Sequence, residues 1–114
     1  MNDFIEKPIT AEVRELVLRI MERAMFYNST STEKKCTGDK PTFFVKFSGH
    51  IATLEVDIHT NGWKPQCNSE EFTICLVEIG YNGTSDDIQN KLESVIKRME
   101  EVYDIWYEKE YTNE

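Results

Sequence analysis

The stretch 42-TFFVKFSGHIATLEVDIH-59 decides the fold, because apolar and polar side chains alternate along most of it. The alternation continues on both sides of a turn expected at Gly49 and His50. A period of two is typical of antiparallel strands that bury one face and leave the other in water. The residues expected on the buried face are Phe43, Val45, Phe47, Ala52, Leu54, Val56 and Ile58.

A third apolar run, 72-FTICLVEIGY-81, follows a long connection, 60-TNGWKPQCNSEE-71. The run is apolar on both faces, which predicts a third strand whose second face is partly covered. The connection is long for a hairpin loop, and long loops in compact domains are often functional.

Helical periodicity flanks these strands on both sides. After Thr10, a good N-cap residue, apolar residues recur every three or four positions as far as Tyr27. Thr84 or Ser85 is expected to cap a last helix whose apolar stripe ends at Trp106. The order αβββα predicts an α+β fold, with a three-stranded antiparallel sheet and the N- and C-terminal helices packed on one face. We expect a single domain over residues 1–114.

The composition is that of a globular protein. The 114 residues are 39% hydrophobic and 11% aromatic, which suffices for one core. No run approaches the roughly 18 consecutive apolar residues of a membrane span, and the N-terminus lacks the pattern of a signal peptide. We therefore expect a cytoplasmic protein, in which three irregularly spaced cysteines do not predict disulfides.

The net charge of −8 is unevenly distributed. Residues 1–54 carry seven acidic and eight basic side chains, whereas residues 55–114 carry fourteen and five. This excess of acid argues against direct nucleic-acid binding, which needs a basic surface. It also argues against a double-stranded RNA-binding domain, which the αβββα order resembles in topology.

The end of the last predicted helix concentrates this acid. Glu100, Asp104 and Glu108 stand at i, i+4 and i+8, without the basic partners that earlier acids of the helix have. They also approach the negative end of the helix dipole. Tyrosines interleave with this line outside the core stripe. One interpretation is a solvated acidic end; the other is a binding face for a basic partner, because exposed aromatic residues are typical of interfaces.

Catalytic chemistry has little support in the sequence. Cys67 and His59 are the one nucleophile and base near each other in the chain, and no motif surrounds them. Glu70 and Glu71 would raise the pKa of a thiol beside them and make it less reactive. We therefore do not expect an enzyme.

The sequence also permits a zinc site. No C-x₂-C or H-x₃-H spacing is present, but His59 closes the second predicted strand, and Cys36 and Cys67 lie in loops that can meet at one end of the sheet. Asp39 or Asp57 would complete a tetrahedral site. The alternative is that the thiols are incidental, because free cysteine commonly behaves as a small hydrophobe. No cofactor is required.

The short motif Asn61-Gly62-Trp63, followed by the consecutive acids Glu70 and Glu71, resembles small phage-encoded anti-CRISPR proteins that inhibit type II RNA-guided nucleases. The chain is also similar to these proteins in size, acidity and order of secondary-structure elements. It implies a non-enzymatic inhibitor, acting in a bacterial cell, that occupies a basic surface of a CRISPR nuclease or blocks loading of target DNA. Rows of carboxylates on a rigid domain can act as a DNA mimic.

On this reading the acid of the last helix meets basic residues of the partner, and acids of the strand region extend the patch across the wet sheet face. The expected partner-binding residues are Glu100, Asp104, Glu108, Glu110, Tyr107, Tyr111, Glu55, Asp57, Glu70 and Glu71. The second hypothesis is a small phage or bacterial accessory protein that self-associates through the apolar face of its third strand, with or without zinc. The first hypothesis fits a monomer and the second a homodimer.

Overall fold

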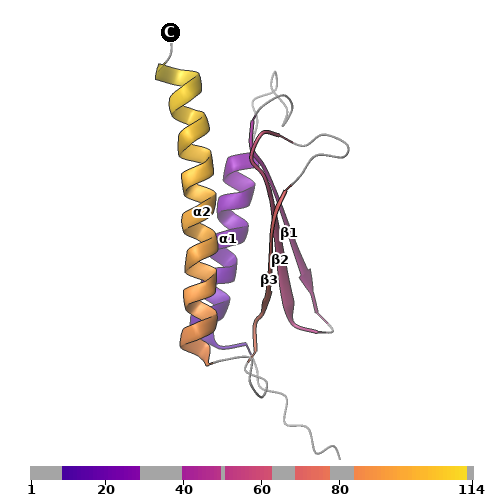
Figure 1. Ribbon diagram of the computed structural model, residues 1–114. Coiled ribbons are helices and arrows are strands. Elements are labelled where there is room, and N and C mark those ends of the chain that lie inside the picture. Colours follow the sequence, from indigo (N-terminus) through magenta and orange to yellow (C-terminus); the bar gives the residue numbers. More distant parts are fainter. Residues whose placement is uncertain (1–8, 29–39, 50, 63–68, 78–83, 113–114) are drawn as a thin grey trace, which may run out of the picture.

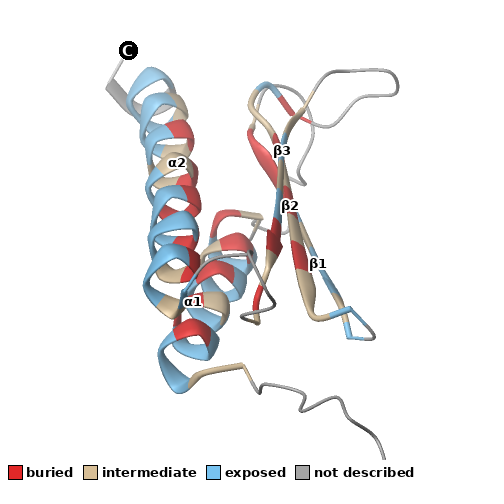
Figure 2. Ribbon diagram, turned by 60° about the horizontal axis from the view of Figure 1, so that its bottom comes forward, coloured by how far each residue is buried: buried red, intermediate tan, exposed pale blue. Residues whose placement is uncertain are grey.

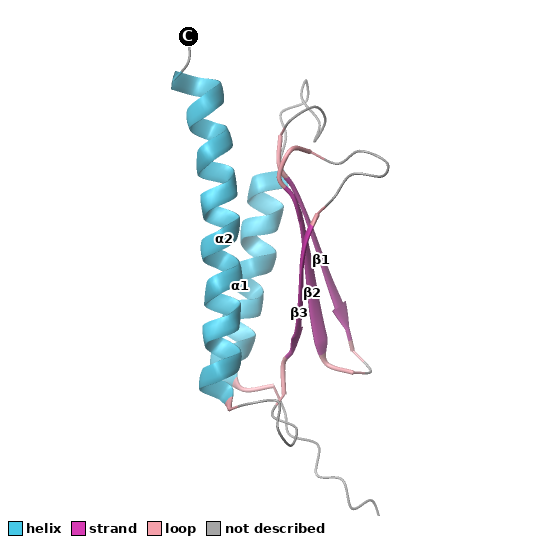
Figure 3. Cartoon of the chain, viewed as in Figure 1, coloured by secondary structure: helices cyan, strands magenta, loops and turns pink. Residues whose placement is uncertain are grey.

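The computed structural model describes residues 9–28, 40–49, 51–62, 69–77 and 84–112, without the side chains of residues 110–112. Its elements are α1 (Ala11–Asn28), β1 (Thr42–Ser48), β2 (Thr53–His59), β3 (Glu70–Cys75) and α2 (Ser85–Thr112). The strands form an antiparallel sheet in the order β1-β2-β3. Both helices cover one face of this sheet (Figures 1 and 3). The predicted αβββα arrangement is confirmed.

The middle strand, β2, supplies the central row of the core. Leu54, Val56 and Ile58 are fully buried, while the residues between them face the open side of the sheet. Figure 2 shows buried residues on the facing surfaces of the helices and the sheet. Burial of each large aliphatic side chain contributes about 1.5–3 kcal/mol. The core around this row includes Val13, Leu16, Ile20, Phe43, Ile74, Leu76, Ile88, Leu92, Val95 and Met99.

The two helices run parallel and in register with each other (Figure 1). At their start, the hydroxyl oxygens of Thr10 and Ser85 lie 3.3 Å apart, within hydrogen-bonding distance. Near the end of α1, the ring of Tyr27 stacks on that of Tyr103 with 4.2 Å between centres. Because α1 ends at Asn28, the C-terminal turns of α2 continue beyond it.

Side-chain caps fix where both helices begin. The backbone N–H of Val13 donates to Oγ1 of Thr10 at 3.2 Å. The N–H of Asp87 donates to Oγ1 of Thr84 at 3.3 Å, and the N–H of Thr84 donates to Oδ2 of Asp87 at 3.0 Å. This reciprocal pair is a capping box, and the backbone hydrogen bond from Thr84 is the main cause that lowers the pKa of Asp87. The cap of α2 is therefore Thr84, and Ser85 is the first helical residue.

Asn28, the last residue of α1, fastens this helix to the outer edge of β1. Its Nδ2 donates to the carbonyl oxygen of Phe43 at 2.6 Å, and its Oδ1 accepts from the N–H of Phe43 at 3.0 Å. Phe43 therefore directs its backbone groups away from β2. By the alternation of an antiparallel ladder, Val45 and Phe47 direct theirs outward as well. Asn28 occupies one end of the position that a further strand would take.

Several predicted details of the strands are wrong. Phe47 was expected in the core but is 49% exposed, because burial along β1 fades after Phe43. Ala52 belongs to the turn before β2, with a left-handed φ of 48°. This conformation lets its N–H reach the carbonyl of Gly49 at 3.4 Å and close the loop. Strand β3 begins at Glu70, inside the predicted loop, and ends at Cys75.

The Asn28→Ala variant tests the fastening of α1 to β1. It removes both hydrogen bonds to Phe43, so we expect the free energy of unfolding to fall by about 1–3 kcal/mol. Urea denaturation measures this change. Asn90→Ala, at an exposed position of α2, is the matched control and should change the same quantity by less than about 0.5 kcal/mol. Equal stability of the two variants would contradict the role assigned to Asn28.

Candidate binding surfaces

The C-terminal turns of α2 form the first candidate surface, called here the α2 tip and defined by Asp104, Ile105, Tyr107 and Glu108. All four residues are exposed. They lie at or past the level where α1 ends at Asn28, so this part of α2 extends beyond its neighbour (Figure 1). Glu110 and Tyr111 belong to the same turns, but their side chains lie outside the described part of the structure.

Glu100 has a basic partner on the other helix. Its Oε2 lies 3.4 Å from Nη2 of Arg23 on α1, so the expectation that it lacks a basic partner is wrong. The partner comes from the other helix, which spacing within α2 does not reveal. Beside this pair the pKa of Tyr27 is raised, chiefly by burial; Arg23 opposes the shift, and Glu100 and Asp104 add to it.

Trp106 is half-buried, although it was expected to continue the core stripe of α2. Its ring lies 5.6 Å from Nζ of Lys40, a cation–π arrangement, and its centre is 5.6 Å from that of Tyr103. The buried stripe of α2 ends at Val102, because α1 terminates beside the next turn. These ring contacts support the base of the α2 tip.

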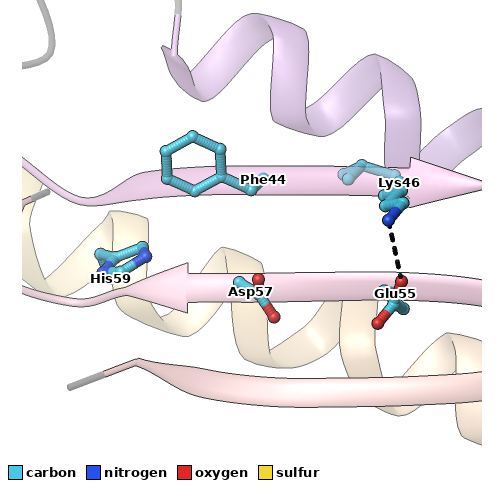
Figure 4. Close-up of a pocket in the computed structure, with 6 residues that line it drawn as sticks. Phe44, Lys46, Glu55, Asp57 and His59 are labelled. Atoms are coloured by element: carbon cyan, nitrogen blue, oxygen red, sulfur yellow. Dashed lines mark ion pairs between the residues drawn. The ribbon is translucent and has the colours of Figure 1, made fainter.

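The open face of the sheet is the second candidate surface (Figure 4). Nζ of Lys46 lies 4.0 Å from Oε2 of Glu55, and the ring of His59 meets that of Phe44 edge-on at 5.3 Å. The register of β2 and β3 places Asp57 directly opposite the exposed Glu71. Like charges opposite each other are destabilising. A shallow depression here is lined by Phe44, Val45, Lys46, Glu55, Asp57 and His59.

Glu70 does not extend this open face, contrary to expectation. It is paired with Ile58 in the register, so its side chain turns toward the helices. There it accepts hydrogen bonds from Nε of Arg98 at 2.7 Å and from Nη2 at 2.5 Å. The alternation of the third strand contains the missed signal: counting back by two from Ile74 through Phe72 places Glu70 on the helix side.

The two acidic surfaces lie on opposite sides of the fold. The α2 tip belongs to the helix layer, whereas Glu55 and Asp57 project from the other side of the sheet, with the helices behind it (Figure 4). Glu71 lies opposite Asp57 in the register and shares its face. The single patch expected to run from the last helix across the sheet is therefore not formed. Each surface has to be tested by itself.

The predicted zinc site falls largely outside the described residues. Cys36, Cys67 and Asp39 all lie there, and His59 packs against Phe44 as described above. Within the described ranges, no three His, Cys, Asp or Glu side chains are placed to hold a metal ion. The zinc site stays a prediction.

The ion pair between Glu70 and Arg98 predicts how stability depends on pH. The hydrogen bonds from Arg98 hold the pKa of Glu70 below its ordinary value of 4.5. A carboxyl group whose pKa is lower in the folded state stabilises the fold above the unfolded-state pKa, and this contribution disappears as the pH falls below 4.5 through the folded-state value. We expect Glu70→Gln to lower the free energy of unfolding at pH 7 by at most about 1 kcal/mol, because both side chains are partly exposed.

Urea denaturation at neutral pH and at a pH well below 4.5 measures this effect. The difference between wild type and Glu70→Gln should shrink on acidification. Glu93→Gln, at an exposed position of α2, is the control and should follow the wild type at both pH values. A difference between wild type and Glu70→Gln that does not change with pH would contradict the prediction.

The features compared with anti-CRISPR proteins are only partly described. Gly62 ends the turn after β2 with a φ of 89°, and its N–H donates to the carbonyl of His59 at 3.2 Å, whereas Trp63 lies outside the described residues. In the part of the chain that the structure describes, neither helix has the apolar length needed to cross a membrane. Comparison of the chain with protein-family models, curated proteins and solved structures finds no match.

Proposed function

We propose that this chain is a non-enzymatic acidic protein that binds a basic surface of a nucleic-acid-handling enzyme through its α2 tip and thereby inhibits that enzyme. A CRISPR effector nuclease is the target that the sequence resemblance suggests. The observation that carries the proposal is the combination of exposed carboxylates and exposed large apolar side chains on turns of α2 that extend beyond α1.

Carboxylates alone would be explained by solubility, but the α2 tip also exposes apolar surface. Ile105 is 63% exposed and Tyr107 is 48% exposed, and on the helix surface they lie on either side of the row formed by Asp104 and Glu108. Interfaces combine a central apolar or aromatic anchor with a polar rim. The tip has both parts, and the ring of Tyr107 lies 6.1 Å from that of Tyr103. The anchor is therefore attached to the packed part of the helix.

The charge of α2 suits a partner that normally binds nucleic acid. The helix carries eight acidic and four basic side chains, whereas α1 carries three of each. Asp104 and Glu108 are one turn apart, roughly 6 Å along the axis, and are both exposed. Such a row of negative charge competes for the Lys and Arg side chains that bind phosphates. Association driven by these charges is fast and weakens as salt increases.

Charge reversal at the α2 tip tests the proposal. In the Asp104→Lys/Glu108→Lys variant, we expect inhibition of the target nuclease to weaken by at least about tenfold, because each reversal replaces attraction by repulsion. The measurement is cleavage of target DNA by purified, guide-loaded CRISPR nucleases, titrated with this protein at low and high salt. Circular dichroism and urea denaturation establish that the variant is folded.

The open sheet face provides a matched control. Glu55→Lys/Asp57→Lys makes the same change in net charge on the open face of the sheet (Figure 4) and should inhibit as the wild type does. Loss of inhibition in this variant alone, with full inhibition by the tip variant, would overturn the assignment to the α2 tip. Absence of inhibition or binding by the wild type across CRISPR nucleases and other DNA enzymes would overturn the function itself.

A further inference from the structure

We propose that two copies of this chain form a two-fold symmetric dimer through the outer edge of β1 and the adjoining flank of α1, called here the β1 edge surface. It consists of Leu18, Met21, Met25, Val45 and Phe47. These residues are distinct from the α2 tip, so the dimer and the inhibitory function can fail independently.

The helical part of this surface is a line of exposed apolar side chains. Leu18 and Met25 are 60% and 67% exposed, and Met21 between them is also exposed. Their spacing of three and four residues puts them on one side of α1. Asn28 follows three residues later on the same side, and its side chain bonds to the outer edge of β1. The line therefore runs along the flank of α1 that adjoins this edge.

The strand part of the surface is a sheet edge whose outward backbone groups have no partner strand among the described residues. Val45 and Phe47 direct their backbone N–H and C=O groups outward, and no described residue hydrogen-bonds to these groups. Asn28 fills the edge only at Phe43. A strand edge of this kind is a template for pairing with another strand. The half-exposed ring of Phe47 supplies apolar surface on the side of the sheet that faces the helices.

The opposite edge of the molecule differs. The flank of α2 that adjoins β3 carries Lys91, Ser94 and Arg98, and Arg98 is bonded to Glu70 of that strand. On its open side, β3 carries Glu71, Thr73 and Cys75. The described part of the third strand therefore does not present an apolar open face, and self-association through that strand stays a prediction. The apolar edge is the one formed by β1 and α1.

The β1 edge surface fits a second copy because the described residues leave it uncovered in both the helix layer and the sheet. An extended peptide added to β1 would complete the ladder but would leave Leu18 and Met25 in water, since they lie on the helix. A second copy brings both elements at once. Its β1 pairs with the free edge of β1, and its α1 covers the exposed apolar flank of α1. A two-fold interface is self-complementary in this sense, and antiparallel pairing of two identical strands has two-fold symmetry.

Charge also favours this edge for contact between copies. The net charge of the chain is −8, so two copies repel each other in general. Helix α1, with three acidic and three basic residues, is neutral, and Lys46 is the single charged residue of β1. The acid of α2 lies in the other half of the helix layer. Approach through the β1 edge surface thus keeps the acidic regions of the two copies apart.

Two features select the register of the paired strands. Asn28 occupies the edge at Phe43, so pairing must use the residues after it. Placing Lys46 opposite its own copy would set like charges against each other. In the register that avoids both conflicts, Phe47 lies opposite Phe47 of the second copy, and Lys46 lies opposite Ser48.

The exposed area is also sufficient for a contact. Leu18, Met21, Met25 and Phe47 together expose roughly 400 Å², comparable to the apolar patches of about 300–600 Å² that are often functional.

Light scattering after size exclusion, over a range of protein concentrations, tests the dimer. We expect the wild type to reach twice the monomer mass of 13.4 kDa, with association that high salt does not weaken. Leu18→Glu/Met25→Glu should weaken association at least tenfold, and circular dichroism should show an intact fold. Ile105→Glu, an equally exposed apolar position on α2, is the matched control and should dimerise as the wild type does.

Oxidative cross-linking of Phe47→Cys with diamide tests the register. Residues opposite each other in a hydrogen-bonded pair have Cα atoms about 5.5 Å apart, which a disulfide spans. We expect a cross-linked dimer from Phe47→Cys and none beyond the wild-type background from Phe44→Cys, on the other face of β1. A wild type that stays monomeric up to about millimolar concentration would overturn the proposal, and so would undiminished dimerisation of Leu18→Glu/Met25→Glu.

Discussion

The rest of the structure depends on the packing of one row of β2 against the two helices. This row consists of Leu54, Val56 and Ile58, which are fully buried. A strand with one apolar face is stable only when that face is covered, and here the cover is a pair of parallel helices. Three strands spaced about 4.8 Å apart occupy a width of about 14 Å, whereas two helices packed about 8–10 Å apart, each about 10 Å in diameter, occupy about 18–20 Å. The two helices are therefore wider than the three strands beneath them. The flank of α1 beside the outer edge of β1 reflects this mismatch, because its apolar residues extend beyond the core.

The two surfaces proposed for binding arise from two different mismatches: one in the lengths of the two helices, and one in the widths of the helix layer and the sheet. The α2 tip exists because α2 has 28 residues and α1 has 18, although they start level with each other. The β1 edge surface exists because the helix layer exceeds the sheet sideways. The first is acidic and suits a basic partner; the second is uncharged along most of its length and suits another apolar edge. A dimer built through the second would present two α2 tips.

Local periodicity and cap residues were sufficient to predict the element order, the N-cap of α1, the N-cap of α2 to within one residue, and the burial of Leu54, Val56 and Ile58. Contacts between elements were not predictable in the same way. Glu100 looked unpaired because its partner Arg23 lies on the other helix, and only the parallel register brings the two together. Asn28 directly follows Tyr27, where the predicted apolar periodicity ends, and nothing in the sequence indicates that it reaches Phe43. Glu70 is the exception, since strand alternation extended by two residues would have placed it correctly.

The hydroxyl contact between Thr10 and Ser85 joins residues 75 positions apart, and the later contacts of the helix pair, such as that of Tyr27 with Tyr103, join residues about as far apart in the sequence. Contacts between distant residues slow folding, because the chain must close a long loop before they form. During synthesis, at about 5–20 residues per second, α1 emerges several seconds before the helix that covers it. Its buried residues Val13, Leu16 and Ile20 stay open to chaperones and to aggregation through that interval. The rate at which the chain is translated from the end of α1 to the end of α2 therefore sets how long the nascent protein is vulnerable.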